Sequence, residues 1–278
     1  MAHTHEFPVE MMCRVMEVSS SGFYSWRQRS EPENESADEL NERIKKSFED
    51  SRETYGSPRI AEDLDVPKST VARRMKALGI SVKAKKRFVT TTDSDHDFAI
   101  AENLLNREFT ADQPAEKWVS DITYFRVNNR WNYLTAIIDL ADRAVVSWVI
   151  SDNMTAEDTT IRAFKKAIQN RKPKEGLIFH SDRGSQYACH KFQQLLAVND
   201  CIPSMSRKGN CWDNAVSESF FKTLKSECYY RRQFRCRAEA FTVTFDFIDG
   251  WYNTKRIHTT LGGMSPNQAF KAMTESNC

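Results

Sequence analysis

Apolar and polar positions in the middle of the chain recur with the periods of strands and helices, and they predict a mixed α/β domain. Three β-rich runs come first, at residues 118–127, 131–140 and 143–150. After them, helical patterns alternate with short apolar runs. In chain order these later segments are a helix at 155–171, a strand at 176–182, a helix at 188–199, a strand at 202–205 and a helix at 213–230. The pattern predicts one sheet with helices packed against it.

The order of these elements narrows the fold class. Three strands followed by helix, strand, helix, strand and helix is the order of a ribonuclease-H-like α/β fold. We assign residues 113–230 to a domain of this class. Residues 231–278 are expected to form a C-terminal helical extension.

The chain before this domain carries helical patterns only. Residues 1–30 predict a short helical segment, and residues 38–92 predict two short helices joined by a tight turn at Asp65–Lys68. Ser69 is the expected N-cap of the second helix, and Gly79 closes it. A basic second helix after a tight turn is typical of a helix-turn-helix that binds DNA, although an ordinary helical hairpin fits this segment equally well.

Composition indicates a chain with ample apolar residues for a core. Hydrophobic residues make up 40% of 278, and no uninterrupted apolar run approaches the ~18 residues of a membrane helix. The first residues lack the basic start and apolar stretch of a secretion signal. Seven cysteines are present without a CxxC pair, which favours free thiols. We therefore expect a soluble protein of the reducing cytoplasm.

Charge is distributed unevenly along the chain. The 40 basic and 38 acidic residues give a net charge of +2, which by itself argues against a nucleic-acid partner. Residues 66–92, however, contain no acid and eight basic residues. A second basic cluster surrounds one acid, Glu227, and consists of Lys222, Lys225, Arg231, Arg232, Arg235 and Arg237. Such clusters are typical of phosphate binding, and a solvated helix face is the alternative.

Three acidic residues fall at informative places in the predicted fold. Asp121 lies in the first strand, Asp182 at the end of the fourth strand, and Glu218 on the helix at 213–230. If the first and fourth strands are neighbours, the aspartates lie side by side. Three grouped carboxylates need a cation, and Mg²⁺ or Mn²⁺ suits oxygen ligands. Spacing alone does not show that these three acids form a site, because a chain with 38 acidic residues offers many such sets of three.

Four sequence blocks surround these acids and extend the pattern. They read SDITYF, HSDRGSQY, SMSRKGNCWDNAVSESFFKTLKSE and WYNTKRIHTTLGGMSPNQAF. In this order they resemble the blocks of OrfB-type transposases of insertion-sequence family three, within the retroviral-integrase-like DDE superfamily. The resemblance covers nearly the whole chain, since FPVEMMCRVMEVSSSGFYSW and YGSPRI are similar to the family's opening and helix-turn-helix region.

The resemblance implies an integrase catalytic core that cleaves and joins DNA strands at element ends. It implies that Asp121, Asp182 and Glu218 are the catalytic triad and hold two divalent ions, Mg²⁺ or Mn²⁺. It also implies a bacterial, nucleoid-associated protein with terminal-repeat and target DNA as partners. The chain is expected to form a homo-oligomer on DNA, with an upstream OrfA product as a further partner.

Several polar residues near the triad and in the helix-turn-helix are candidates for DNA contact. Lys222 and Lys225 follow Glu218 by four and seven residues, so one helix face carries all three. The further candidates are Arg183, Gln186, Arg73, Arg74, Arg256 and His258. For Arg256 and His258, bracing of the core is the alternative. Asp213 is expected to cap the Glu218 helix.

Two rival functions remain open from the sequence. The first is a non-catalytic DNA-binding regulator of the element, which the basic window at 66–92 would serve. The second is a ribonuclease H-type hydrolase, which uses the same fold and the same type of acidic site.

Overall fold

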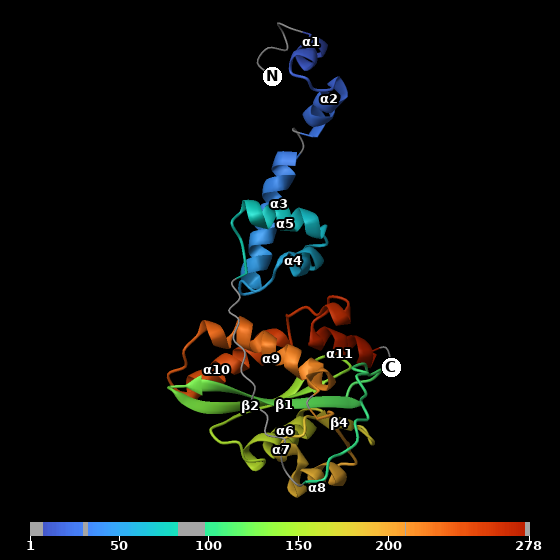
Figure 1. Ribbon diagram of the computed structural model, residues 1–278, viewed down its shortest axis with the longest axis vertical. Coiled ribbons are helices and arrows are strands. Elements are labelled where there is room, and N and C mark those ends of the chain that lie inside the picture. Colours follow the sequence, from blue (N-terminus) through green and yellow to red (C-terminus); the bar gives the residue numbers. More distant parts are fainter. Residues whose placement is uncertain (1–7, 30–32, 83–97, 209, 276–278) are drawn as a thin grey trace. The chain divides into compact units, whose positions relative to one another are not determined.

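The computed structural model describes residues 8–29, 33–82, 98–208 and 210–275 (Figure 1). The chain divides into two compact units, Met1–Lys83 and Ala84–Cys278. Each unit is considered by itself.

The first unit is helical. Its helices are α1 (Val9–Val15), α2 (Ser20–Arg29), α3 (Glu33–Asp50), α4 (Ser57–Leu64) and α5 (Lys68–Ala77). In the region expected to bind DNA, α4 and α5 pack beside the end of α3 (Figure 1). Ile44, Ile60 and Val71, one from each of these helices, are fully buried and form the small core of the three-helix cluster.

The turn between α4 and α5 has the expected place, but its caps differ from expectation. Asp65 adopts the left-handed conformation that ends α4. The prediction that Ser69 caps α5 is wrong: α5 begins at Lys68 with Pro67 at the cap position, because the fixed φ of proline, here −53°, suits a helix start. Gly79 closes the helix as predicted, with φ +66° and an N–H that donates to Lys76 O. The rest of the predicted 38–92 region after residue 82 lies outside the described residues.

The second unit contains a mixed five-stranded sheet. Its strands are β1 (Lys117–Val127), β2 (Arg130–Asp139), β3 (Val145–Ser151), β4 (Ile178–Ser181) and β5 (Ile202–Met205). The spatial order is β3-β2-β1-β4-β5. The first three strands form an antiparallel meander, and β4 and β5 run parallel to β1. The hairpin turn between β1 and β2 has Asn128 and Asn129 at positive φ, the conformation that favours asparagine.

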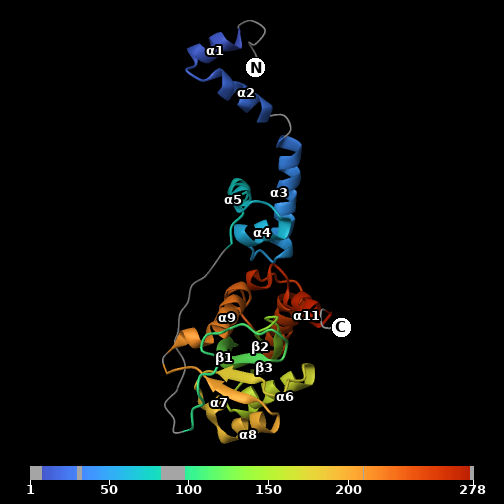
Figure 2. The ribbon, with the colours of Figure 1, turned by 90° about the vertical axis from the view of Figure 1, so that its right-hand side faces the viewer.

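Helices cover both faces of this sheet. One face carries a π-helical turn (Glu157–Ile161), α6 (Arg162–Asn170), α7 (Ser185–Ala188) and α8 (His190–Val198). The other carries α9 (Ala215–Glu227), α10 (Arg237–Phe247) and α11 (Pro266–Glu275), as Figure 2 shows. Short helical turns at Cys211–Asn214, Tyr229–Arg231, Ile248–Tyr252 and Thr259–Leu261 join or extend these helices. This arrangement is the predicted ribonuclease-H-like α/β fold.

The core lies mainly between the sheet and the α6–α8 layer. Trp118 from β1 and Phe164 from α6 meet edge to face, with ring centroids 6.3 Å apart. Phe179, Tyr187 and Phe192 continue this aromatic cluster, and all three are at most 1% exposed. Edge-to-face rings favour a fixed geometry beyond their burial, so this cluster holds β1 and β4 firmly side by side.

Two buried acids outside the triad have structural partners. Arg171 after α6 binds Asp139 Oδ2 at 2.8 Å and Asp142 Oδ2 at 2.7 Å. The indole N–H of Trp118 also donates to Asp139. The Arg171 guanidinium stacks on the Phe270 ring of α11 at 4.3 Å, so the cluster anchors the C-terminal helix. Burial raises the pKa of Asp142 to about 6.

Candidate active site

The point at which β1 and β4 stop pairing brings two of the three predicted carboxylates to one edge. The strands are parallel neighbours with Val119 opposite His180. Asp121 and Asp182 each follow two residues later, so both leave the paired region at the same edge. A backbone N–H holds one oxygen of each: Ile122 N–H donates to Asp121 Oδ1 at 2.7 Å, and Gly184 N–H donates to Asp182 Oδ1 at 2.9 Å.

Glu218 lies in the first turn of α9, the helix that crosses β1. Burial, then the charge of Asp182, and more weakly the charge of Glu218 raise the pKa of Asp121 well above its ordinary value. Partial burial also raises the pKa of Glu218. The charges of Asp182 and Glu218 thus both act on Asp121 and favour its neutral form unless a cation is present.

The donor set suits a hard divalent cation, but the side chains are not gathered around a point. Within the residues that the structure describes, no three His, Cys, Asp or Glu side chains are close enough together to enclose a metal ion. The fit to such an ion thus rests on the oxygen ligands and on the raised pKa of Asp121, which burial and the neighbouring carboxylates cause. Of the three side chains, Glu218 is exposed, whereas Asp121 and Asp182 are half-buried.

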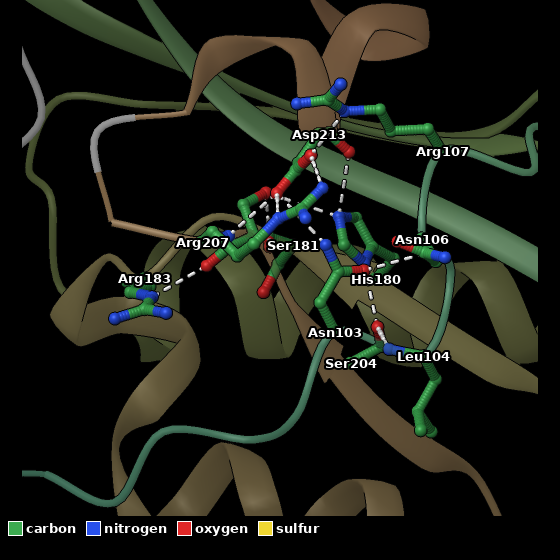
Figure 3. Close-up of polar contacts among 11 residues, drawn as sticks. Asn103, Leu104, Asn106, Arg107, His180, Ser181, Arg183, Ser204, Arg207 and Asp213 are labelled. Atoms are coloured by element: carbon green, nitrogen blue, oxygen red, sulfur yellow. Dashed lines mark hydrogen bonds and ion pairs between the residues drawn. The ribbon is translucent and has the colours of Figure 1, made fainter.

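Asp213 anchors the approach to the Glu218 helix, and its role differs from the predicted helix cap (Figure 3). Its carboxylate is fully buried and binds Arg107 Nε at 3.0 Å and Arg207 Nε at 2.8 Å. Asn103 Nδ2 and the Arg207 backbone N–H also donate to it, both at 3.0 Å. The cap expectation is wrong because these donors, led by Arg207, occupy the carboxylate and hold its pKa well below the usual range.

His180 on β4 ties Asp213 to the strand that carries Asp182. Its Nε2 donates to the Asp213 carbonyl at 3.0 Å, and its Nδ1 accepts from Ser204 Oγ at 2.8 Å. Ser204 in turn accepts the Leu104 N–H. Burial lowers the pKa of His180 to about 4, so the ring is neutral and acts as a fixed link. We call Asn103, Arg107, His180, Arg207 and Asp213 the Asp213 network.

Tyr187 is a further residue beside the aspartates that the sequence did not single out. It lies on α7, is 1% exposed, and its hydroxyl is 2.8 Å from Ser120 Oγ on β1. Burial and the charges of Asp121 and Asp182 raise its pKa well above the ordinary value. Its position in the HSDRGSQY block, five residues after Asp182, is the sequence feature that could have identified it as a site residue.

The candidates for DNA contact near the triad fall into two groups. Lys222 is exposed, and Lys225 is half-buried with its Nζ 5.0 Å from the Tyr124 ring centroid. Arg183 and Gln186 are half-buried and bind loop carbonyls: Arg183 Nε donates to Ser206 O, and Gln186 Nε2 donates to Met154 O. Lys222 thus presents its charge to solvent more directly than Lys225 or Arg183 does.

Arg256 does not fit the expected role in DNA contact. It is 3% exposed, and its guanidinium binds both carboxylate oxygens of Glu227, at 2.8 and 3.2 Å. His258 packs edge-on against Tyr252, with ring centroids 4.9 Å apart. For Arg256 the prediction is corrected, because a buried bidentate ion pair braces α9 against the C-terminal part of the chain.

The helix-turn-helix candidates both lie on α5. Arg73 is exposed, whereas Arg74, the next residue along the helix, is half-buried. The first unit therefore presents Arg73 to solvent more fully than Arg74.

Comparisons with known proteins agree with this fold. Residues 111–211 and 199–266 match two families described as integrase core domain, and residues 35–88 match a family described as HTH-like domain. An uncharacterized 31 kDa protein of insertion element IS600 from Shigella sonnei is 39% identical over 261 residues, which cover 92% of this chain and 96% of that protein.

A second relative carries a functional name. Transposase InsF of insertion sequence IS3A from Escherichia coli (strain K12) is 36% identical over 274 residues, covering 96% of this chain and 95% of that protein. A simian T-cell lymphotropic virus intasome contains a chain with the same fold at a TM-score of 0.50 and 15% identity, covering 77% of this chain and 74% of that one.

Fold, domain matches and relatives together define a DDE-type transposase or integrase with an HTH-like domain before its integrase core. More narrowly, the chain belongs to the OrfB-type transposases of insertion-sequence family three. No helix in the described part of the chain is long and apolar enough to cross a membrane.

Proposed function

We propose that this transposase cuts DNA at the ends of its insertion element and joins the freed 3′ ends to target DNA, with Asp121, Asp182 and Glu218 holding two divalent ions, Mg²⁺ or Mn²⁺. One observation carries the proposal. The parallel register of β1 and β4 places two aspartates at one edge, where the charge of Glu218 from α9 acts on Asp121. A carboxylate whose pKa is raised by burial and by two neighbouring carboxylates favours a cation beside it.

The residues of the chain have separate tasks in this reaction. When bound, divalent ions activate the attacking oxygen and stabilise the leaving oxygen of a phosphodiester. Asp121 and Asp182 are held by backbone N–H groups, so each keeps its orientation. The Asp213 network fixes the start of the Glu218 helix against β4. No residue needs to bond covalently to DNA, because the attacking groups are water and then the 3′-hydroxyl.

The partners follow from the same assignment. Arg73 and Arg74 on α5 bind terminal-repeat DNA, while Lys222 and Lys225 on α9 contact phosphates beside the carboxylates. The protein acts in the bacterial cytoplasm at the nucleoid, as a homo-oligomer on DNA and with an OrfA product. The integrase core, the HTH-like domain and the intasome that shares the fold support these proposals.

The test replaces Glu218 with Gln in the full chain and measures DNA binding and strand cleavage separately. Gln keeps the volume and removes the charge, so binding of terminal-repeat duplex is expected to persist while Mg²⁺-dependent cleavage and joining are lost. Glu175→Gln, on an exposed glutamate outside the site, is the matched control and should cleave normally.

Three results would overturn the proposal. Full cleavage by the Glu218→Gln variant would show that this carboxylate is not needed. Binding of terminal repeats without cleavage by the unaltered chain would favour the regulator. Preferential cutting of RNA–DNA hybrids would favour the hydrolase.

A further inference from the structure

An aromatic and basic surface surrounds the free end of the β1–β2 hairpin. Tyr124 and Trp131 meet edge to face with ring centroids 5.0 Å apart. The Arg126 guanidinium lies 4.6 Å from the Trp131 ring centroid, and Lys225 Nζ lies 5.0 Å from that of Tyr124. Trp131 nevertheless remains 46% exposed. These four residues are called the hairpin platform.

The platform lies beside the carboxylates. Among the described residues, β4 pairs with β1 only through Lys117–Val119, so in that part of the chain this edge of β1 has no strand partner at Asp121 or Tyr124. At a rise of about 3.3 Å per residue, Tyr124 is roughly 10 Å along the strand from Asp121, and the odd spacing directs the two side chains to opposite faces of β1. Lys225 connects the two positions, because its charge acts on Asp121 while its Nζ contacts the Tyr124 ring.

The second basic cluster of the sequence joins this surface. Val127 bridges to Phe234, and Asn128 N–H donates to Phe234 O at 2.9 Å, which holds the segment after α9 against the hairpin. This segment adds three exposed arginines: Arg231, Arg232 and Arg235.

Two nearby acids are already engaged. Asp152 at the end of β3 binds Arg237 at 2.7 Å, and the Glu239 carboxylate accepts the Arg235 backbone N–H at 2.8 Å. Both acids keep their charge, but they are outnumbered by the basic residues of this region, so the surface has an excess of positive charge; these residues are Arg126, Lys225, Arg231, Arg232, Arg235 and Arg237.

Charge and aromatic rings together identify the occupant. Duplex phosphates need only cations, whereas a half-exposed indole beside a guanidinium offers a stacking surface to an unpaired base. A second copy of this chain would bring arginines against arginines across a symmetric contact. We propose that the hairpin platform binds unpaired nucleotides of the DNA strand that enters the carboxylate site, an inference that rests on the proposed function.

The experiment measures two affinities of the full chain by fluorescence anisotropy, in EDTA so that no strand is cut. One probe is a blunt terminal-repeat duplex, and the other is the same duplex with a tail of about six unpaired thymidines. The intact protein should bind the tailed probe more tightly. Trp131→Ala should weaken binding of the tailed probe about tenfold and leave the blunt probe nearly unchanged, because stacking of one base is lost.

Two variants control for general damage. Trp131→Phe keeps an aromatic face and should restore most of the tailed-probe affinity. Phe245→Ala removes another exposed aromatic ring, 54% exposed on α10, and should bind both probes normally.

The inference is overturned if Trp131→Ala binds the tailed probe as the intact protein does, or if it weakens both probes equally. A change in sedimentation mass with unchanged DNA affinity would instead assign the platform to self-association. The proposed function can fail independently of this inference. If the intact protein prefers the tailed probe but never cleaves DNA with Mg²⁺, the platform inference stands and the proposed cleavage activity is refuted. If the intact protein cleaves normally but binds the tailed and blunt probes equally, only the platform inference is refuted.

Discussion

Replacing Asp213 with Asn tests whether the Asp213 network holds the active site together. The change keeps the shape of the side chain and removes the charge that Arg107 and Arg207 share. An amide also turns a donor toward these guanidinium groups, so at least one hydrogen bond is lost. We expect a less stable core domain and slower strand cleavage.

The size of the effect follows from the exposure of the partners. Breaking a fully buried ion pair costs about 3–5 kcal/mol, and breaking an exposed pair costs about 0–1 kcal/mol. Here the carboxylate is fully buried, but both arginine side chains are 48% exposed and can be rehydrated. An intermediate loss of about 2 kcal/mol follows, which lowers the melting temperature of a domain of this size by about 6 °C.

The pH dependence of the stability loss shows whether the loss comes from the charge of Asp213. The pKa of Asp213 is held well below its ordinary value by Arg207 and Arg107. A lowered folded-state pKa contributes stability that is present above the unfolded value of about 3.9 and is lost as pH falls through the folded value. The gap between the intact protein and Asp213→Asn should thus be constant from neutral pH to about 5 and narrow below about 4.

The assay is thermal or urea unfolding across this pH range, with cleavage measured at a temperature where both proteins are folded. Asp152→Asn is the matched control, because its pair with Arg237 is exposed on both sides, and it should change neither property appreciably. Equal stability of Asp213→Asn and the intact protein at neutral pH would refute the reasoning. A gap that persists unchanged at low pH would also refute it.

Two further substitutions probe the site and its support. Gly184→Ala places a methyl group 3.0 Å from Asp182 Oδ1, so cleavage should fall by roughly tenfold while the unfolding free energy changes by less than about 1 kcal/mol; unaltered cleavage would contradict this contact. Arg256→Gln leaves Glu227 buried without its partner and should cost about 3 kcal/mol in urea unfolding. In Arg256→Gln, the slope of log affinity against log salt concentration should stay the same. A lower slope would show that Arg256 contacts DNA phosphate.

The sheet was predictable because its signals are local. The β-rich runs at 118–127, 131–140 and 143–150 lie within a few residues of one another, so strands β1, β2 and β3 follow from the sequence. The meeting of Asp121 and Asp182 at one edge follows in turn from parallel pairing of the first and fourth strands.

The Asp213 network was not predictable because its partners are remote in sequence. Asn103 and Arg107 lie 110 and 106 residues before Asp213, and no periodic pattern links them. A short polar residue before a helix is usually a cap, and that general preference led to the wrong role for Asp213.

The same limit explains the misassigned arginine. Arg256 lies in a polar block near the end of the chain, which predicts exposure. Its partner Glu227 is 29 residues away on α9, and only tertiary packing shows that both are buried. Sequence reasoning therefore predicted the elements that carry the candidate acids, and it did not predict the buried contacts of Asp213 and Arg256 that support them.

The most direct test of the account asks whether Asp121 itself contacts the cation that cleavage needs. In Asp121→Cys a thiolate replaces the carboxylate, and softer Mn²⁺ tolerates a sulfur ligand better than Mg²⁺ does. Cleavage of terminal-repeat DNA by this variant is measured with each ion, beside Asp213→Cys as the control. The account predicts that Asp121→Cys is inactive with Mg²⁺ and regains cleavage with Mn²⁺, while the control shows no such switch. Full cleavage with Mg²⁺, or no recovery with Mn²⁺, would contradict direct binding of the cation by Asp121.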